Sequence, residues 1–242
     1  MSQSASTLKK LSFELGGNAP FIVFDDADLE KAVDGAIASK LRQSGQTCVC
    51  ANRLYIQEGI YDKFAKLITE KVSKLKQGHG LHEGVTHGPL IHERAVEKVK
   101  SQIQDAVDKG AKVLFGGKPA TNLGPLFHQL TVLGDVPRNA IVNTDETFGP
   151  LVPLIKFKTE EEVIELANNT EYGLAGYFFT SDYKKIFRVG EALNVGMVGA
   201  NSGGITEAAL PFGGVGWSGF GREGSKYGID DYIVIKSVVV AL

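Results

Sequence analysis

Residues 20–57 read PFIVFDDADLEKAVDGAIASKLRQSGQTCVCANRLYIQ. The apolar run at 20–24 predicts a short buried strand, and 53–57 predicts a second one. Between them, the apolar residues of a predicted helix follow helical spacing: Leu29, Val33, Ala36, Ile37 and Leu41. Asp25 or Asp26 is the expected N-cap of this helix. A strand, a helix and a strand in this order predict two parallel strands joined by a crossover helix.

The rest of the chain continues this alternation. Further helices are expected at 61–75, 96–107, 159–168 and 183–193. Further strands are expected at 112–115, 151–157, 177–180, 196–200 and 232–240. Thr159 with Glu162 matches a capping box, and Asp182 is the expected N-cap of the helix at 183–193. Gly110 is expected to end the helix at 96–107. The sequence therefore predicts an α/β fold with a largely parallel sheet flanked by helices.

Composition narrows the class of protein. The 242 residues carry 26 Lys and Arg against 28 Asp and Glu, so no basic face for nucleic acid is expected. The most apolar run, 232–242, is too short to span a bilayer, and 1–10 lacks the apolar core of a signal peptide. Two cysteines exclude a disulfide scaffold and suit a reducing compartment, either the cytoplasm or the mitochondrial matrix.

Two overlapping glycine motifs match the dinucleotide pattern GxGxxG, at 214–219 and 219–224. That pattern binds phosphate only after a strand, before a helix, and about 20 residues ahead of an acidic side chain. Neither match follows a clear strand, and Asp230 and Asp231 come too soon. We therefore expect a structural glycine loop that lines a site.

Four histidines lie close together at His79, His82, His87 and His92. Four imidazoles suit a transition metal, but this run also holds four glycines and no cysteine. We therefore expect a solvent-exposed loop and no metal site.

A cysteine motif, SGQTCVC at 44–50, follows the predicted helix. A single cysteine is most often buried packing. Cys48, however, lies in a loop of small polar residues where free backbone amides lower a thiol pKa and bind an oxyanion. Cys48 is therefore a candidate nucleophile, while Cys50 is either core packing or a disulfide partner of Cys48.

The stretch Glu14-Leu15-Gly16-Gly17 has two readings. It is either a routine turn or a general base whose small neighbours admit a substrate.

Together these motifs resemble the aldehyde dehydrogenase superfamily. FELGGN at 13–18 resembles its glutamate motif, and GQTC at 45–48 its cysteine motif. ETFGP at 146–150 resembles the segment that holds the nicotinamide ribose. PFGG at 211–214, followed by 218–223, resembles the late glycine loop near the substrate. The resemblance covers essentially the whole chain.

The resemblance implies covalent catalysis. Cys48 would attack an aldehyde to form a thiohemiacetal, and Glu14 would activate the water that cleaves the resulting thioester. Glu146, Phe148 and Leu15 would contact the nicotinamide end of NAD or NADP. The choice between the two nucleotides stays open.

A narrower resemblance is to the succinate-semialdehyde dehydrogenase branch. CVCAN at 48–52, Arg42 six residues before Cys48, and GREGSKYG at 221–228 carry it. It implies that Arg42 anchors the distal carboxylate of the substrate and that Thr206 replaces a substrate-contacting serine. Asp145 and Gly216-Trp217 depart from the family pattern.

Members of that family are longer, and the portion before Glu14 would hold their nucleotide domain. The resemblance thus divides the chain into a remnant of the connection at 1–12, a catalytic domain at 13–228 and an oligomerisation strand at 229–242. No bound nucleotide and no activity are expected of the chain alone. Its expected partners are a small aldehyde and further copies of itself, with no nucleic acid and no membrane.

Three other functions remain open. A cysteine hydrolase would need a basic partner for Cys48, usually histidine, and the histidines cluster in an unrelated loop. A non-catalytic assembly module would use the apolar stretch 232–242 for strand pairing. A dehydrogenase for another aldehyde would keep Cys48 and Glu14 but change the role of Arg42.

Overall fold

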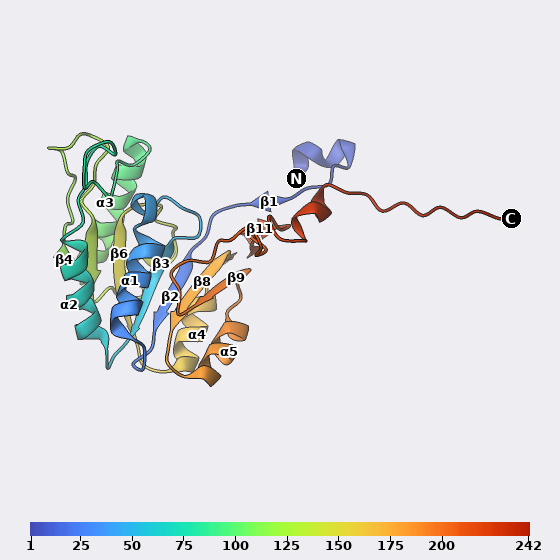
Figure 1. Cartoon of the computed structure of the whole chain (residues 1–242). Coiled ribbons are helices and arrows are strands. Elements are labelled where there is room, and N and C mark those ends of the chain that lie inside the picture. Colours follow the sequence, from blue (N-terminus) through green and yellow to red (C-terminus); the bar gives the residue numbers. More distant parts are fainter.

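Seven strands form the central sheet of the computed structural model, which describes residues 1–242 (Figure 1). Their order across the sheet is β4-β5-β6-β3-β2-β8-β9. The strands are β2 (Ala19–Val23), β3 (Ala51–Gln57), β4 (Lys112–Phe115), β5 (Thr131–Gly134), β6 (Leu151–Phe157), β8 (Ala175–Phe179) and β9 (Met197–Ala200). Every neighbouring pair is parallel except β4 and β5. The predicted α/β fold with a largely parallel sheet is confirmed.

Helices cover both faces of this sheet (Figure 1). The helices are α1 (Leu29–Lys40), α2 (Tyr61–Val72), α3 (Glu93–Asp108), α4 (Glu160–Asn168) and α5 (Tyr183–Ala192). In β2, Phe21 and Val23 join the core beneath α1 and α2, whereas Ile22, with Phe24 just after the strand, joins the core beneath the other three helices. Alternate residues of a strand point to opposite faces, so one apolar run serves two cores.

The N-cap predicted for α1 is wrong. Asp28 caps this helix by accepting a hydrogen bond from the N–H of Lys31. Asp25 accepts from the N–H of Ile60, and Asp26 accepts from the hydroxyl of Thr180. These two aspartates therefore fasten the end of β2 to its neighbouring loops.

Two local details differ from expectation. Strand β5 was not predicted, because four residues at Thr131–Gly134 carry too short a pattern to recognise. At the start of α4, the hydroxyl of Thr159 accepts a hydrogen bond from the N–H of Glu162. A capping box also needs the Glu162 carboxylate to accept from the N–H of Thr159, but this carboxylate accepts from the N–H of Lys158. Half of the predicted capping box is formed. Asp182 caps α5 as predicted.

Two small antiparallel pairs lie outside the main sheet. Strand β1 (Phe13–Glu14) pairs with β11 (Gly219–Phe220), and β7 (Tyr172–Gly173) pairs with β10 (Val215–Gly216). The remaining turns are η1 (Ser2–Thr7), η2 (Arg42–Gly45), η3 (Ile141–Asn143) and η4 (Gly228–Asp231). The GxGxxG matches thus form strand pairs and tight turns, and neither leads into an α-helix.

The C-terminal residues 233–242 form no strand within this chain. They extend away from the main body in Figure 1, and most of their apolar side chains are exposed. A strand contributed to another copy of the chain therefore stays a prediction. Among the helices, none combines the length and the apolar character needed to cross a membrane.

Candidate active site

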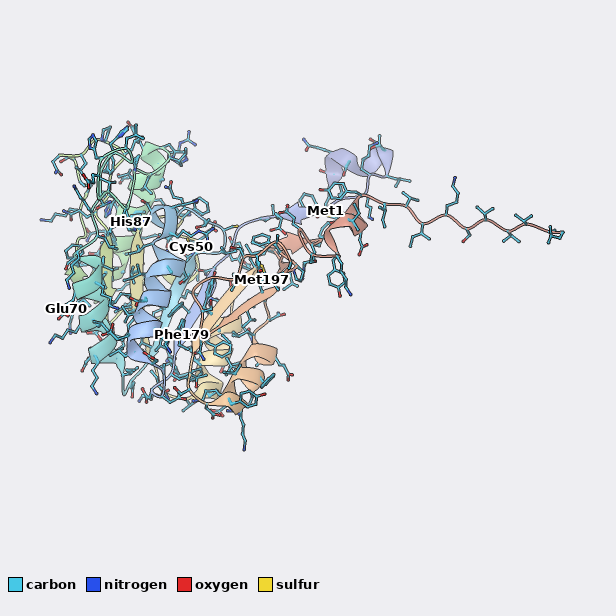
Figure 2. The ribbon with its side chains drawn as sticks, in the orientation of Figure 1. Met1, Cys50, Glu70, His87, Phe179 and Met197 are labelled. Carbon is cyan, nitrogen blue, oxygen red and sulfur yellow. The ribbon has the colours of Figure 1, made fainter.

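Three predicted site residues lie just before three adjacent strands. Glu14 precedes β2, Cys48 precedes β3 and Glu146 precedes β6. These strands are neighbours and run parallel, so their amino ends meet at one edge of the sheet. Figure 2 shows Cys50 near the upper end of the sheet, whereas Phe179, the last residue of β8, lies toward the lower end. The topology itself brings the cysteine and the two glutamates together.

Cys48 lies on a tight turn between η2 and β3. Gly45 has a φ of +78°, and a Cβ at this position would lie 2.1 Å from the carbonyl oxygen of Gly149. Only glycine allows this approach. The hydroxyl of Ser44 donates to the carbonyl of Gly88 at 2.8 Å, which fixes the other side of the turn.

The Cys48 thiol is partly exposed, and its pKa is raised above the ordinary value. Burial is the main cause, and the negative charges of Glu14 and Glu146 add to it. The backbone N–H groups of Cys48 and Val49 act in the opposite direction, as the sequence suggested, but burial outweighs them. The thiol is therefore mostly protonated at neutral pH and needs a base before it can attack.

Glu14 lies in β1 and is partly buried, with Oε2 buried and without a hydrogen-bond partner. Burial raises its pKa, the charge of Glu223 raises it further, and Arg222 opposes both. Glu14 lines a cavity of about 670 Å³ together with Ser12, Arg222, Glu223 and Asp231. A carboxyl group with a raised pKa beside an open cavity can accept a proton and pass it to water.

Glu146 is held by the glycine pair. The N–H of Gly17 donates to Oε1 of Glu146 at 3.0 Å. A Cβ at Gly16 would lie 3.0 Å from Oε2 of Glu146, and one at Gly17 would lie 2.6 Å from the carbonyl oxygen of Cys48. Gly17 needs glycine because the backbone of Cys48 passes so close to it, whereas a Cβ at Gly16 would only require the Glu146 carboxylate to shift.

Phe148 and Leu15 are exposed, at 37% and 49% of their full area. Phe148 has a φ of +52°. Exposed apolar side chains and carboxylate oxygens are groups that suit the ring and ribose hydroxyls of a nicotinamide nucleotide, so the contacts expected of Leu15, Phe148 and Glu146 stay a prediction. The chain lacks a glycine-rich turn from a parallel strand into a helix, which is the usual binding site for the phosphates of such a nucleotide.

Arg42 and Thr206, predicted to bind substrate, line one small hollow with Ser39, Val49 and Tyr177. The guanidinium of Arg42 makes no hydrogen bond or ion pair, and Arg42 is exposed. The hydroxyl of Tyr177 donates to the carbonyl of Val49 at 2.8 Å, which ties the hollow to the cysteine turn. The structure thus brings the predicted substrate residues together beside Cys48.

Cys50 is buried, and its Sγ lies 2.8 Å from Oγ1 of Thr47. Both cysteines are free thiols. The packing role of Cys50 is therefore visible in the structure, and its redox role stays a prediction.

The histidine run is not a metal centre. No group of three or more His, Cys, Asp or Glu side chains in the chain is placed to hold a metal ion. His79 and His82 are exposed, and His92 caps α3 through the N–H of Ala95. His87 is buried, contrary to the expected exposed loop.

Sequence reasoning missed two residues near the site, Ser218 and Lys40. Ser218 is fully buried. Its hydroxyl accepts a hydrogen bond from the N–H of Gly173 and donates one to the carbonyl of Gly16. Lys40 is fully buried at the end of α1. Its position four residues after Ala36 places it on the apolar face of the helix, and that spacing was the available signal.

A family comparison agrees with this geometry. Residues 1–238 match the model of the aldehyde dehydrogenase family. The chain belongs to the aldehyde dehydrogenase family. The family assignment predicted from the four motifs is confirmed.

Individual relatives within the aldehyde dehydrogenase family are similar over the whole chain. The succinate-semialdehyde dehydrogenase [NADP(+)] of Escherichia coli is 60% identical over 100% of this chain and 50% of its own length. A glutarate-semialdehyde dehydrogenase of Pseudomonas aeruginosa is 59% identical over 98% of this chain and 49% of its own. The crystal structure of succinate-semialdehyde dehydrogenase from Burkholderia pseudomallei superposes with a TM-score of 0.98 at 57% identity, covering 100% of this chain and 50% of that one. The chain spans about half the length of the relatives it matches.

Proposed function

We propose that this chain carries the catalytic-cysteine portion of an NADP-dependent dehydrogenase for carboxylate-terminated aldehydes, with succinic semialdehyde as the first candidate substrate. One observation carries the proposal. The partly exposed Cys48 thiol lies within electrostatic reach of Glu14 and Glu146, beside the hollow that holds the unpaired Arg42. The relatives named for succinate and glutarate semialdehydes support the substrate class.

Attack begins with loss of the thiol proton. The proton passes to solvent, so that Glu14 keeps its carboxylate unprotonated for the later hydrolysis step; the charge of Glu14 raises the pKa of the thiol and does not activate it. Sγ then bonds to the aldehyde carbon and forms a thiohemiacetal, while the backbone N–H of Cys48 stabilises the oxyanion.

Oxidation needs a hydride acceptor, which the nicotinamide of NADP⁺ supplies when bound. In this chain Glu146, Phe148 and Leu15 are the proposed contacts for that end of the nucleotide. With such an acceptor present, the thiohemiacetal would lose a hydride and leave a thioester on Cys48. Glu14 then takes a proton from water, the hydroxide attacks the thioester carbon, and the acid product leaves Cys48.

Arg42 is the proposed anchor for the distal carboxylate. Its guanidinium has no partner within the chain, so a substrate carboxylate would gain two hydrogen bonds without displacing an existing ion pair. Thr206, which lines the same hollow, offers a hydroxyl to the same group.

The proposed division of the chain follows from the same roles. Residues 13–228 hold the chemistry, 1–12 connect them to a nucleotide domain, and 229–242 pair as a strand with another copy. The phosphates and the adenosine of NADP⁺ would then be held mainly by residues outside this chain. The chain alone is expected to bind the nucleotide weakly and to reduce none.

A chimera tests the proposal. The chain replaces the matching half of the E. coli NADP(+) enzyme, and reduction of NADP⁺ is followed with succinic semialdehyde. Activity that disappears in Cys48→Ala and persists in Cys50→Ser is expected. In parallel, the chain alone is mixed with p-nitrophenyl acetate, whose cleavage should depend on Cys48.

The two assays separate the alternatives. A folded but inactive chimera, with ester cleavage by the chain alone, would indicate a cysteine hydrolase and overturn the proposal. No histidine acts on the Cys48 thiol, which argues against that outcome. Failure of both reactions would leave an assembly module, for which the exposed apolar segment 233–242 is the supporting feature.

A further inference from the structure

Lys40 is a fully buried cation that the proposed chemistry does not use. It is the last residue of α1, and none of its surface is exposed. Its Nζ donates one hydrogen bond, to Oδ1 of Asn52 at 2.8 Å, and it forms no ion pair. Burying an ammonium group is costly, and an apolar side chain would fill this space at lower cost.

A line of hydrogen bonds leads from Lys40 to Glu146. Asn52, also buried, donates through Nδ2 to the carbonyl of Gly17 at 3.4 Å. The N–H of the same Gly17 donates to Oε1 of Glu146 at 3.0 Å. The Lys40–Asn52–Gly17–Glu146 relay therefore joins α1, β3, the glycine turn and the loop before β6.

Charge acts along the same line. Burial lowers the pKa of Lys40 to about 8, while the two groups that face it, Cys50 and Glu146, oppose this decrease. Burial raises the pKa of Glu146, and the N–H of Gly17, the exposed Lys98 and the buried Lys40 oppose this increase. Lys40 thus offsets part of the cost of keeping Glu146 ionised.

We propose that Lys40 is a positioning residue for Glu146, whose carboxylate it keeps ionised and oriented through its own charge and the Asn52–Gly17 relay. The use of this carboxylate for the nucleotide ribose rests on the proposed function. The placement of the carboxylate by Lys40 does not, and it can be measured without nucleotide.

The first test is a ¹³C NMR titration of the 242-residue chain labelled at the side-chain carboxyl carbon of glutamate. Cys48→Ser and Cys50→Ser are introduced first, so that no thiol contributes, and Glu146→Gln assigns the signal. The Glu146 signal should show a second inflection near pH 8, where Lys40 loses its proton. Absence of that inflection would overturn the proposal, even if every Lys40 variant failed to fold.

The second test compares Lys40→Met and Lys40→Gln with Lys98→Met. Both Lys40 variants should lose the inflection near pH 8 and titrate Glu146 at a higher pH. Lys98 is exposed, so Lys98→Met should keep the inflection, and its effect on Glu146 should fade in 1 M salt. An effect of Lys40→Met that fades in the same way would contradict a buried charge.

The third test uses the chimera. Lys40→Met should raise the KM for NADP⁺ by about tenfold, the loss expected when one charge-assisted hydrogen bond is weakened, with a smaller change in kcat. An unchanged KM for NADP⁺ would overturn the positioning role. An inactive chimera would count against the proposed function and leave the NMR result to decide the role of Lys40.

Discussion

The hydroxyl of Ser218 donates a hydrogen bond to the carbonyl oxygen of Gly16 at 2.7 Å, across 202 residues of sequence. The hydroxyl oxygen of Ser218 also accepts a hydrogen bond from the N–H of Gly173 at 3.0 Å. One buried side chain thereby joins the glutamate segment, β7 and the late glycine loop. The position of Glu14 depends on this junction, because the N–H of Leu15 also donates to the carbonyl of Ser218.

Replacing Ser218 with Ala should destabilise the chain. The substitution leaves the buried N–H of Gly173 without a partner, at about 1–3 kcal/mol, and also removes the partner of the part-buried Gly16 carbonyl. Urea unfolding followed by circular dichroism measures the change. Ser101→Ala is the matched control, because Ser101 is exposed on α3 and bonds only the carbonyl of Lys98. Equal stabilities of the two variants would contradict the junction.

Replacing Glu14 with Gln should make Cys48 more reactive while it slows turnover. The negative charge of Glu14 raises the pKa of the thiol, so its removal lowers that pKa and increases the thiolate fraction at pH 8. Alkylation by iodoacetamide should accelerate by about two- to fivefold. Ester cleavage should fall, because the base for the second step is gone. Slower alkylation would mean that Glu14 activates the thiol in the resting state.

Replacing Arg42 with Ala should affect only substrates that carry a carboxylate. Arg42 is exposed, so we expect the loss of a charged hydrogen bond, a drop of about ten- to 150-fold in kcat/KM for succinic semialdehyde. Butanal, with no carboxylate, should be little affected. Arg42→Lys should recover part of the loss, since an ammonium cannot make the planar two-point contact. Equal losses on both aldehydes in the chimera would assign Arg42 to support of the cysteine turn.

The burial of Lys40 should make stability depend on pH. Its pKa is lowered from 10.5 to about 8 in the folded chain, so below pH 8 both states are protonated and the full burial cost applies. Between pH 8 and 10.5 the unfolded state holds the proton that the folded state has lost, and stability therefore rises with pH. Relative to Lys40→Met, the gain over this interval should approach about 3 kcal/mol. Urea unfolding of both proteins measures this difference in unfolding free energy. A difference that stays the same from pH 7.5 to 10.5 would contradict the prediction.

Mild oxidation should join Cys48 to Cys50. The two residues flank Val49 on one turn, but Cys50 must first leave its contact with Thr47, so the bond should be easily reduced. Mass spectrometry after dilute peroxide should show the loss of two hydrogens in the peptide 44–53, reversed by dithiothreitol. Overoxidation of Cys48 with Cys50 still free would be the contrary result.

The sequence was sufficient to predict the helices and most of the sheet. The run at 20–24 is apolar throughout, and 151–157 is apolar except for the exposed Lys156, as expected of strands buried on both faces. Strand β5 was too short to recognise, and Asp28 was passed over for two neighbours that look equally suited to cap α1. Caps and short strands are decided by contacts with distant loops, as the bonds of Asp25 to Ile60 and Asp26 to Thr180 show.

The site was predictable from its chemistry and not from its fold. Ligands of open parallel sheets usually bind beyond the carboxyl ends of the strands. Cys48, Glu14 and Glu146 lie at the amino ends, where that rule gives no guidance. The motifs supplied these residues. The helical spacing of Lys40 indicated burial, but the partners of Lys40 and Ser218 emerged only from the hydrogen bonds of the structure.

Phe148 has consequences for any attempt to make this chain more heat-resistant. A bulky residue at a φ of +52° is rare, and the left-handed backbone costs roughly 1–2 kcal/mol for residues other than glycine or asparagine. A screen that rewards melting temperature alone would therefore favour Gly or Asn at position 148. Such a variant would relax the backbone and remove the exposed ring proposed to contact the nucleotide. One substitution would then raise the melting temperature and lower the turnover. Position 148 should therefore be kept as Phe while other positions are varied.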